Sequence, residues 1–389
     1  MRLRVVGAMS GTSLDGVDAA VLETDGEAIL GLGRSAYRPY AEAERAILRA
    51  ALGTWPGDPA AEAAARVVED AHADLLADLK GDALAVHGQT LAHDPGGRGT
   101  HQALDGAALA TRLDRPVVWD FRSADVSLGG EGAPLAPAYH HACVRHAGIA
   151  EPVAILNLGG VGNLTWIDPA RDVADAGALL AFDTGPANAP IDDLAQDWLG
   201  EPYDRDGWLA REGEADEALA AAILRHPYFF RVPPKSLDRD AWRERGADID
   251  DLPPSHAAAT WVRVIALSVA HGLSQCPAMP ARVLVAGGGR RNPAIMDALR
   301  AACPCAVDPI ESVGLDGDML EAQAFAFLAV RVLRGLPTSF PGTTGVAAPV
   351  AGGIVSDPQG ALDTVRARAR HNARHGRGRG VSRGASGTR

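Results

Sequence analysis

Small polar residues near the start of the sequence form the first candidate site. Residues 10–16 combine two glycines with several hydroxyl groups, and the carboxylates of Asp15 and Asp18 lie close by. Glycine N–H groups can converge on an anion, and carboxylates can hold the divalent cation that accompanies a nucleotide. We interpret this segment as a cradle for the phosphates of ATP, with Mg²⁺ at Asp15 and Asp18. Its nucleotide-binding candidates are Gly11, Thr12, Ser13, Leu14, Asp15, Gly16, Val17 and Asp18.

Two apolar runs, residues 3–8 and 17–22, flank this segment and predict a β-hairpin. The segment differs from the phosphate loop that leads from a strand into a helix, because no lysine follows and the chain continues as a strand. An ordinary polar hairpin without a ligand is the alternative when the segment is considered alone.

A second glycine turn repeats this pattern. A second strand, glycine turn and strand follow at residues 153–168, with Gly160 and Asn163 at the turn. The repetition predicts a duplicated architecture in which one hairpin from each half faces a shared cleft. A third turn joins a strand to a helix, where close approach of a nucleotide's adenosine is possible and a plain tight turn is the alternative. Its glycines are Gly287, Gly288 and Gly289, and we expect Asn292 to cap the helix that follows.

Polar side chains also end or follow three predicted strands, where α/β folds present residues to ligands. His87 follows one strand, Asp120 and Arg122 end a second, and Asp183 follows the third. Asp183 is the candidate general base, and the Asp120–Arg122 pair could hold sugar hydroxyls or a carboxylate. The structural alternatives are a turn or cap at Asp183, an Asp–Arg bridge, and a histidine that serves the core.

The sequence resembles the anhydro-N-acetylmuramic acid kinases, a family of the actin/hexokinase/Hsp70 superfamily. The resemblance runs from Met9 to about Ile354. It implies an α/β, two-domain actin-like ATPase fold of the ribonuclease H-like type, with duplicated mixed sheets and an interdomain cleft. Eight segments carry it, in the order and at about the spacing seen in the family: MSGTSLDGVD, HGQTLAH, DFRSADVSLGGEGAPLAPAYHH, NLGGVGN, FDTGPAN, PPKS, AGGGRRNPAIM and LEAQAFAFLA.

The resembled reaction joins ring opening to phosphoryl transfer. The resemblance implies that Asp183 deprotonates a water that attacks the anomeric carbon of 1,6-anhydro-N-acetylmuramic acid, while the released 6-oxygen takes the γ-phosphoryl of ATP. The products would be N-acetylmuramic acid 6-phosphate and ADP, in the recycling of cell-wall peptidoglycan. A kinase with another sugar substrate and a non-catalytic sensor are the other hypotheses. The residues implied to contact the sugar are His87, Asp120, Arg122 and Glu321.

Glu321 also has a structural alternative, because a solvated glutamate is favoured in the first turn of a helix. We expect domain I to comprise residues 1–132 and about 345–363, and domain II to comprise residues 133–344. The resemblance further implies a homodimer.

The sequence departs from the family pattern near the expected sugar pocket. Ala124 stands where a second arginine is common, and Glu131 stands where glutamine is common. Both changes lower the positive charge available to a substrate carboxylate. The loop after Lys235 and Ser236 departs too, and we assign this loop no catalytic role. Its changed positions are Leu237, Asp238 and Asp240.

The composition predicts a soluble enzyme. The chain has 389 residues, and its 47% of hydrophobic residues can fill two cores. We find no apolar run of the roughly 18 residues that a membrane span needs and no signal peptide, so we expect a cytoplasmic protein without membrane contact. The four cysteines lack the spacing of a disulfide framework or a zinc site.

The last residues differ from the rest of the chain in charge. Residues 365–389 carry eight arginines and no acid, whereas the preceding residues hold 29 basic against 49 acidic side chains. With almost nothing to bury, this tail is predicted to be a disordered extension. An arm for nucleic acid or an anionic surface is the less favoured alternative.

Overall fold

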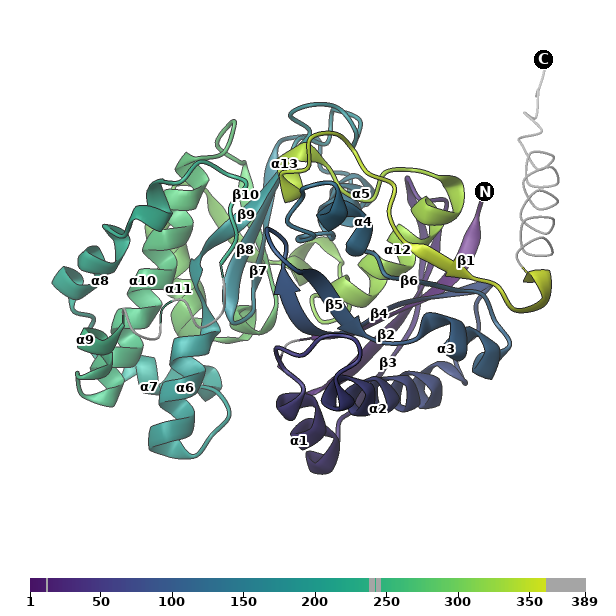
Figure 1. Ribbon diagram of the computed structural model, residues 1–389. Helices are drawn as coiled ribbons and strands as arrows, with labels where there is room; N and C mark the ends of the chain where they lie inside the picture. The colour runs from purple at the N-terminus through teal and green to yellow at the C-terminus, as the bar shows by residue number, and fades with distance from the viewer. Residues whose placement is uncertain (12, 238–241, 243–245, 362–389) are drawn as a thin grey trace, which may run out of the picture.

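The computed structural model describes residues 1–389 except 12, 238–241, 243–245 and 362–389. It is an α/β protein with two mixed sheets, which confirms the predicted fold class. In Figure 1 the half that holds the first sheet lies on the right, and the half that holds the second sheet lies on the left. The predictions for the tail, Thr12, Asp238 and Asp240 fall outside the described residues.

The first sheet has the order β12-β6-β4-β1-β2-β3, with β5 paired to β4. Strands β1, β2 and β3 pair antiparallel, which confirms the predicted first hairpin, and β4 pairs parallel with both β1 and β6. The strands are β1 (Leu3–Ser10), β2 (Gly16–Thr24), β3 (Ile29–Pro39), β4 (Ala83–Asp94), β5 (Gly99–Ala103), β6 (Val117–Trp119) and β12 (Ile354–Ser356).

The second sheet repeats this arrangement. Its order is β11-β10-β7-β8-β9, in which β7, β8 and β9 pair antiparallel and β10 pairs parallel with both β7 and β11. The same sequence of directions occurs along β6-β4-β1-β2-β3, so the predicted duplication is confirmed. The strands are β7 (Val153–Leu158), β8 (Val161–Ile167), β9 (Leu179–Pro186), β10 (Arg282–Ala286) and β11 (Ala306–Pro309).

Helices α1, α2 and α3 share a core with the first sheet. Helix α2 begins where a sequence signal predicts a start: the Asp58 carboxylate accepts the N–H of Ala60, and Pro59 takes the first helical position. The helices of this half are α1 (Glu42–Ala50), α2 (Pro59–Leu76), α3 (Gly106–Leu113) and α4 (Ser123–Ser127).

The second sheet shares its own core with helices that lie between β9 and β11 in the chain. Asn292 caps α11 as predicted, because its side chain accepts the N–H groups of Ala294 and Ile295. The remaining helices are α5 (Pro137–His146), α6 (Asn188–Leu199), α7 (Trp208–Arg211), α8 (Glu217–Leu224), α9 (Ala247–Asp250), α10 (Pro254–Ser274), α11 (Pro293–Ala302), α12 (Leu320–Arg334) and α13 (Pro341–Thr344), with 3-10 helices η1 (Arg205–Gly207), η2 (Pro227–Phe230), η4 (Gly288–Arg291), η5 (Ile310–Val313) and η6 (Pro358–Gly360).

A third core lies between the two sheets and contains α5 and α12. Helix α12 packs directly on β1, and a Cβ built on Gly7 would lie 1.9 Å from the carbonyl oxygen of Ala322. Only glycine permits this approach of two backbones. Helix α12 lies within residues 133–344, which were assigned to domain II, but it packs on the first sheet. The division into domains therefore stays a prediction.

The buried carboxylate of Asp125 joins segments far apart in the sequence. It accepts the N–H of Gly132 at 2.7 Å, the hydroxyl of Thr344 at 2.7 Å and the hydroxyl of Ser339. These bonds fasten the chain where it leaves the first half to the chain where it returns. The Asp125 carboxylate and its three donors therefore form a joint between the two halves.

Helix α10 is long and apolar enough to cross a membrane, judged by length and composition alone. Of its most apolar window, 67% is buried inside the protein, against helices α7, α8 and α11 and strand β9. This is the environment of a core helix.

Candidate active site

In the loop between β1 and β2, the backbone is open on one side at Gly11. A Cβ on Gly11 would meet only the Ser13 hydroxyl, at 3.6 Å, and Leu14 takes a positive φ of 56° while its N–H bonds to the Gly11 carbonyl. The Ser13 hydroxyl donates to the Asp15 carboxylate at 2.8 Å. The hydroxyl of Ser10, one of those counted in residues 10–16, is buried and bonds to Tyr40 and Gln89, so it is not available to a phosphate. The space beside Gly11 would allow an anionic ligand to approach the backbone.

Negative charge is concentrated beside this loop. The pKa of Asp18, which lies on β2, is raised to about 7, chiefly by burial and also by neighbouring carboxylates. A divalent cation would relieve this repulsion, so Asp15 and Asp18 fit a magnesium ion that also binds phosphate and water. Among the described residues no group of three forms a ready metal site. The neighbouring carboxylates are those of Asp15, Glu321, Asp318 and Asp316.

The second hairpin turn lies at the start of α6. The Gly160 carbonyl accepts the N–H of Ala187 at 3.1 Å, and the Gly159 carbonyl accepts the N–H of Asn188 at 2.9 Å. The Asn188 amide also donates to the Leu158 carbonyl. The turn and the helix N-terminus are therefore held together.

The third glycine turn packs against the end of β7. Gly287 has φ 74°, and its Cβ would lie 2.5 Å from the Asn157 side-chain oxygen and 2.6 Å from the Leu158 carbonyl. A Cβ on Gly289 would lie 2.7 Å from the side-chain oxygen of Asn188. The structure thus brings the second and third glycine turns together.

Asp183 lies near the end of β9, half-buried and held on both carboxylate oxygens. Asn163 donates its side-chain amide to Oδ1 and Leu237 donates its N–H to Oδ2, each at 2.8 Å. Burial raises the pKa of Asp183 to about 6, and the two hydrogen bonds oppose this rise. Asn163, assigned to the nucleotide from the sequence, is thereby connected to the candidate base.

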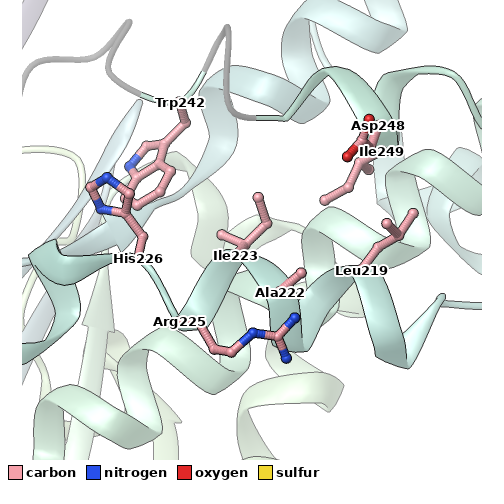
Figure 2. A pocket seen from close by; sticks show the side chains of 8 residues that line it. All are labelled: Leu219, Ala222, Ile223, Arg225, His226, Trp242, Asp248 and Ile249. Atoms are coloured by element: carbon pink, nitrogen blue, oxygen red, sulfur yellow. The ribbon is translucent and has the colours of Figure 1, made fainter.

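A small pocket of about 70 Å³ opens in front of Asp183. Both halves contribute to it, and the Ser236 hydroxyl donates to Glu131 across it at 3.3 Å. Its lining residues are Glu131, Ala133, Pro134, Asn163, Asp183, Pro234, Lys235, Ser236 and Thr343. A larger pocket of about 400 Å³ lies beside α8 and α9 and contains none of the predicted site residues (Figure 2).

Arg122 is fixed by His87. Its Nε donates to His87 Nε2 at 2.8 Å and its Nη1 donates to the Gly132 carbonyl at 2.6 Å, while His87 Nδ1–H donates to the Gly88 carbonyl. Burial and the neighbouring guanidinium hold the pKa of His87 well below its usual value, so the imidazole is neutral. His87 therefore orients Arg122.

Asp120 has Ser123, and not Arg122, as its hydrogen-bond partner. It takes a positive φ of 51° and accepts the hydroxyl of Ser123 at 2.5 Å. Both residues are described, and no ion pair joins Asp120 to Arg122, so the alternative of a structural bridge is not supported. The side chain of Glu321, at the start of α12, is exposed, yet surrounding protein desolvates it and raises its pKa, which Arg122 opposes.

Sequence similarity to known proteins identifies the family of this chain. A family model described as anhydro-N-acetylmuramic acid kinase matches residues 3–357. The chain belongs to this family. An anhydro-N-acetylmuramic acid kinase of Cereibacter sphaeroides is 60% identical over 356 residues, covering 91% of this chain and 96% of the relative. One of Roseobacter denitrificans is 57% identical over 358 residues, covering 92% and 95%.

The family and the enzyme class predicted from the sequence, an anhydro-N-acetylmuramic acid kinase, are therefore confirmed. Solved structures that are similar to this chain include a ROK family glucokinase from Streptomyces griseus in complex with glucose and AMPPNP. It has a TM-score of 0.43 and 14% identity, and the match covers 84% of this chain and 98% of the glucokinase.

Sequence reasoning missed the loop that holds Asp183. We assigned no catalytic role to the residues around Lys235, yet the Leu237 N–H bonds to the Asp183 carboxylate. Tyr228 belongs to the same arrangement, because its hydroxyl donates to the Asp183 carbonyl at 2.6 Å. The similarity of the PPKS segment to anhydro-N-acetylmuramic acid kinases was the available signal, but the contact itself depends on tertiary structure.

Proposed function

We propose that this chain opens the 1,6-anhydro ring of anhydro-N-acetylmuramic acid and phosphorylates O6 with ATP, giving N-acetylmuramic acid 6-phosphate and ADP. Family membership supports the substrate. The observation that carries the proposal is the Asp183 carboxylate, held by two donors and facing a pocket between the halves. With a pKa of about 6 it is ionised at neutral pH and still basic enough to accept a proton.

In the proposed mechanism Asp183 accepts a proton from a water whose oxygen attacks the anomeric carbon. The bond between that carbon and the bridging oxygen breaks, and its electron pair stays on the oxygen attached to C6. This oxygen attacks the γ-phosphorus of ATP, and ADP leaves. The proton taken up by Asp183 passes afterwards to solvent. The half-buried position of Asp183 limits the bulk water that could hydrolyse ATP instead.

The nucleotide is proposed to lie along the three glycine turns. The residues are those from Gly11 to Asp18, Gly160 with Asn163, and the turn from Gly287 to Gly289. Asp15 and Asp18 would hold Mg²⁺, which when bound neutralises charge on the transferred phosphoryl group. The sugar is proposed to contact the residues His87, Asp120, Arg122 and Glu321.

The decisive experiment measures ADP release with ATP, Mg²⁺ and 1,6-anhydro-N-acetylmuramic acid, and identifies the sugar product by mass. We expect a ring-opened 6-phosphate, and a loss of about 10²- to 10⁴-fold in kcat for Asp183→Asn. Asp172→Asn, at an exposed site, is the control and should keep full activity. Sugar-independent ATP hydrolysis, or an active Asp183→Asn enzyme, would refute the assignment.

A kinase of the same fold with another sugar substrate is the second candidate. Glu131 favours it, because it adds a second carboxylate to the pocket of Asp183, whose described lining contains no arginine. A substrate that bears a carboxylate is less favoured there than an uncharged sugar. Turnover of 1,6-anhydro-N-acetylglucosamine, which lacks the lactyl acid, at a higher kcat/KM than the muramic acid would support this candidate.

We further propose that the protein is a cytoplasmic homodimer, in which each chain has the two domains predicted above. It would act in peptidoglycan recycling and amino-sugar catabolism. Light scattering coupled to size-exclusion chromatography would test the dimer, since a single peak at about the mass of one 40.4 kDa chain would contradict it.

A further inference from the structure

Lysine is rare in this chain, and one of its two lysines lies behind the candidate base. The sequence holds 35 arginines but only Lys80 and Lys235 as lysines. Lys80 is exposed, whereas Lys235 is 5% exposed. A compact ammonium fits a small buried site that a planar guanidinium would not fill.

The ammonium of Lys235 lies in a cage of neutral acceptors. Its Nζ donates to the carbonyls of Tyr228 at 3.3 Å and Phe229 at 3.1 Å, and to the side-chain oxygen of Gln275 at 2.9 Å. It also lies 4.9 Å from the ring centre of Tyr228 and 5.7 Å from that of Phe182. No carboxylate pairs with it among the residues described. Its three hydrogens are thus matched by three acceptors.

The ammonium closes a loop of residues 228–237, and both ends of this loop contact Asp183. At the start, the Tyr228 hydroxyl donates to the Asp183 carbonyl. At the end, the Lys235 carbonyl accepts the Asp183 N–H at 2.9 Å, and the Leu237 N–H donates to the carboxylate. The ammonium binds the start of the loop to its end and, through Gln275, to the chain after α10.

We infer that Lys235 is a positioning residue, which holds the Leu237 N–H against the carboxylate of Asp183. The inference rests on the proposed function, because it takes Asp183 as the base. Without the ammonium the loop loses three hydrogen bonds, and the Leu237 N–H is no longer held in place. The Asp183 carboxylate then loses both orientation and a donor that favours its ionised form.

The charged groups around this arrangement do not oppose the inference. Burial and then Arg231 lower the pKa of Lys235 to about 8, so at neutral pH the ammonium form prevails. Facing Asp183 are the neutral amide of Asn163, the phenol of Tyr228 and, across the pocket, Glu131. Loss of the Leu237 donor would therefore raise the pKa of Asp183.

The test is the pH profile of kcat for Lys235→Met, with Lys80→Met as the matched control. We expect a fall of about 10- to 100-fold in kcat, an acid limb displaced to higher pH, and a KM for ATP within about twofold of the parent. Lys80→Met should match the parent throughout. A parental kcat, or a lower kcat with an unmoved acid limb, overturns the inference.

Two further measurements keep the outcome clear. If Lys235→Met does not fold, Gln275→Leu removes one acceptor of the cage, and it should displace the acid limb in the same direction by less; an unmoved limb overturns the inference. Activity of Asp183→Asn would refute the proposed function itself. An inactive Asp183→Asn beside a normal Lys235→Met would refute only the role of Lys235.

Discussion

Burial and hydrogen bonding oppose each other at Asp183, and burial prevails. The group must be ionised to accept a proton, so we predict that kcat falls about tenfold per pH unit below pH 6 and levels off above it. Steady-state kinetics from pH 4.5 to 8 at saturating substrates would measure this limb. A kcat that stays constant down to pH 5 would contradict the assignment of the base.

The same pKa has a consequence for stability. Because the folded pKa of Asp183 is raised from 3.8 to about 6, the folded chain holds the proton more tightly than the unfolded chain. The stabilisation from the protonated form is complete below pH 3.8 and is lost as pH rises through 6. We therefore compare the free energy of unfolding of Asp183→Asn with that of the parent. We predict that this difference is up to about 3 kcal/mol more favourable to the variant at pH 8 than at pH 4. Urea denaturation at both pH values measures it, and an equal difference at both would contradict it.

At the scale of elements, the glycine turn after β10 can be tested with a matched pair. Gly287 and Gly314 both have positive φ, 74° and 78°, but only at Gly287 would a Cβ meet backbone and side-chain atoms within 3 Å. We predict that Gly314→Ala costs about 1 kcal/mol and that Gly287→Ala costs about 1–3 kcal/mol more. Gly287→Ala should also raise the KM for ATP, measured by the same assay. Equal losses in both variants would show that the close approach is unimportant.

Elements with a local signal were predictable from the sequence. Apolar runs around glycine turns identified both hairpins, and Asn292 before a proline identified the start of α11. The partners of Arg122 were not predictable, because His87 comes from β4 and reaches it only when the sheet forms. The loop around Lys235 was missed for the same reason: its contacts with Asp183 join residues with no periodic relation in the sequence.

At the scale of the whole molecule, Asp125 is the joint between the halves. Asp125→Ala would leave the Gly132 N–H and the hydroxyls of Ser339 and Thr344 without their buried acceptor. We predict a loss of about 3 kcal/mol or more in the free energy of unfolding. Chemical denaturation would measure it, with Asp172→Ala as an exposed control. A loss below about 0.5 kcal/mol would show that the joint is not needed for stability.

The contact between Gly7 and α12 affects how natural variants of this enzyme should be read. Gly7 lies in the middle of a strand and touches no proposed substrate, yet it sets the distance at which the first turn of α12 rests. Glu321 precedes Ala322 in that turn, so a methyl group added at Gly7 would displace a carboxylate of the proposed sugar site. A strain carrying such a change would show the phenotype of an active-site lesion, although the altered codon specifies a residue of the core.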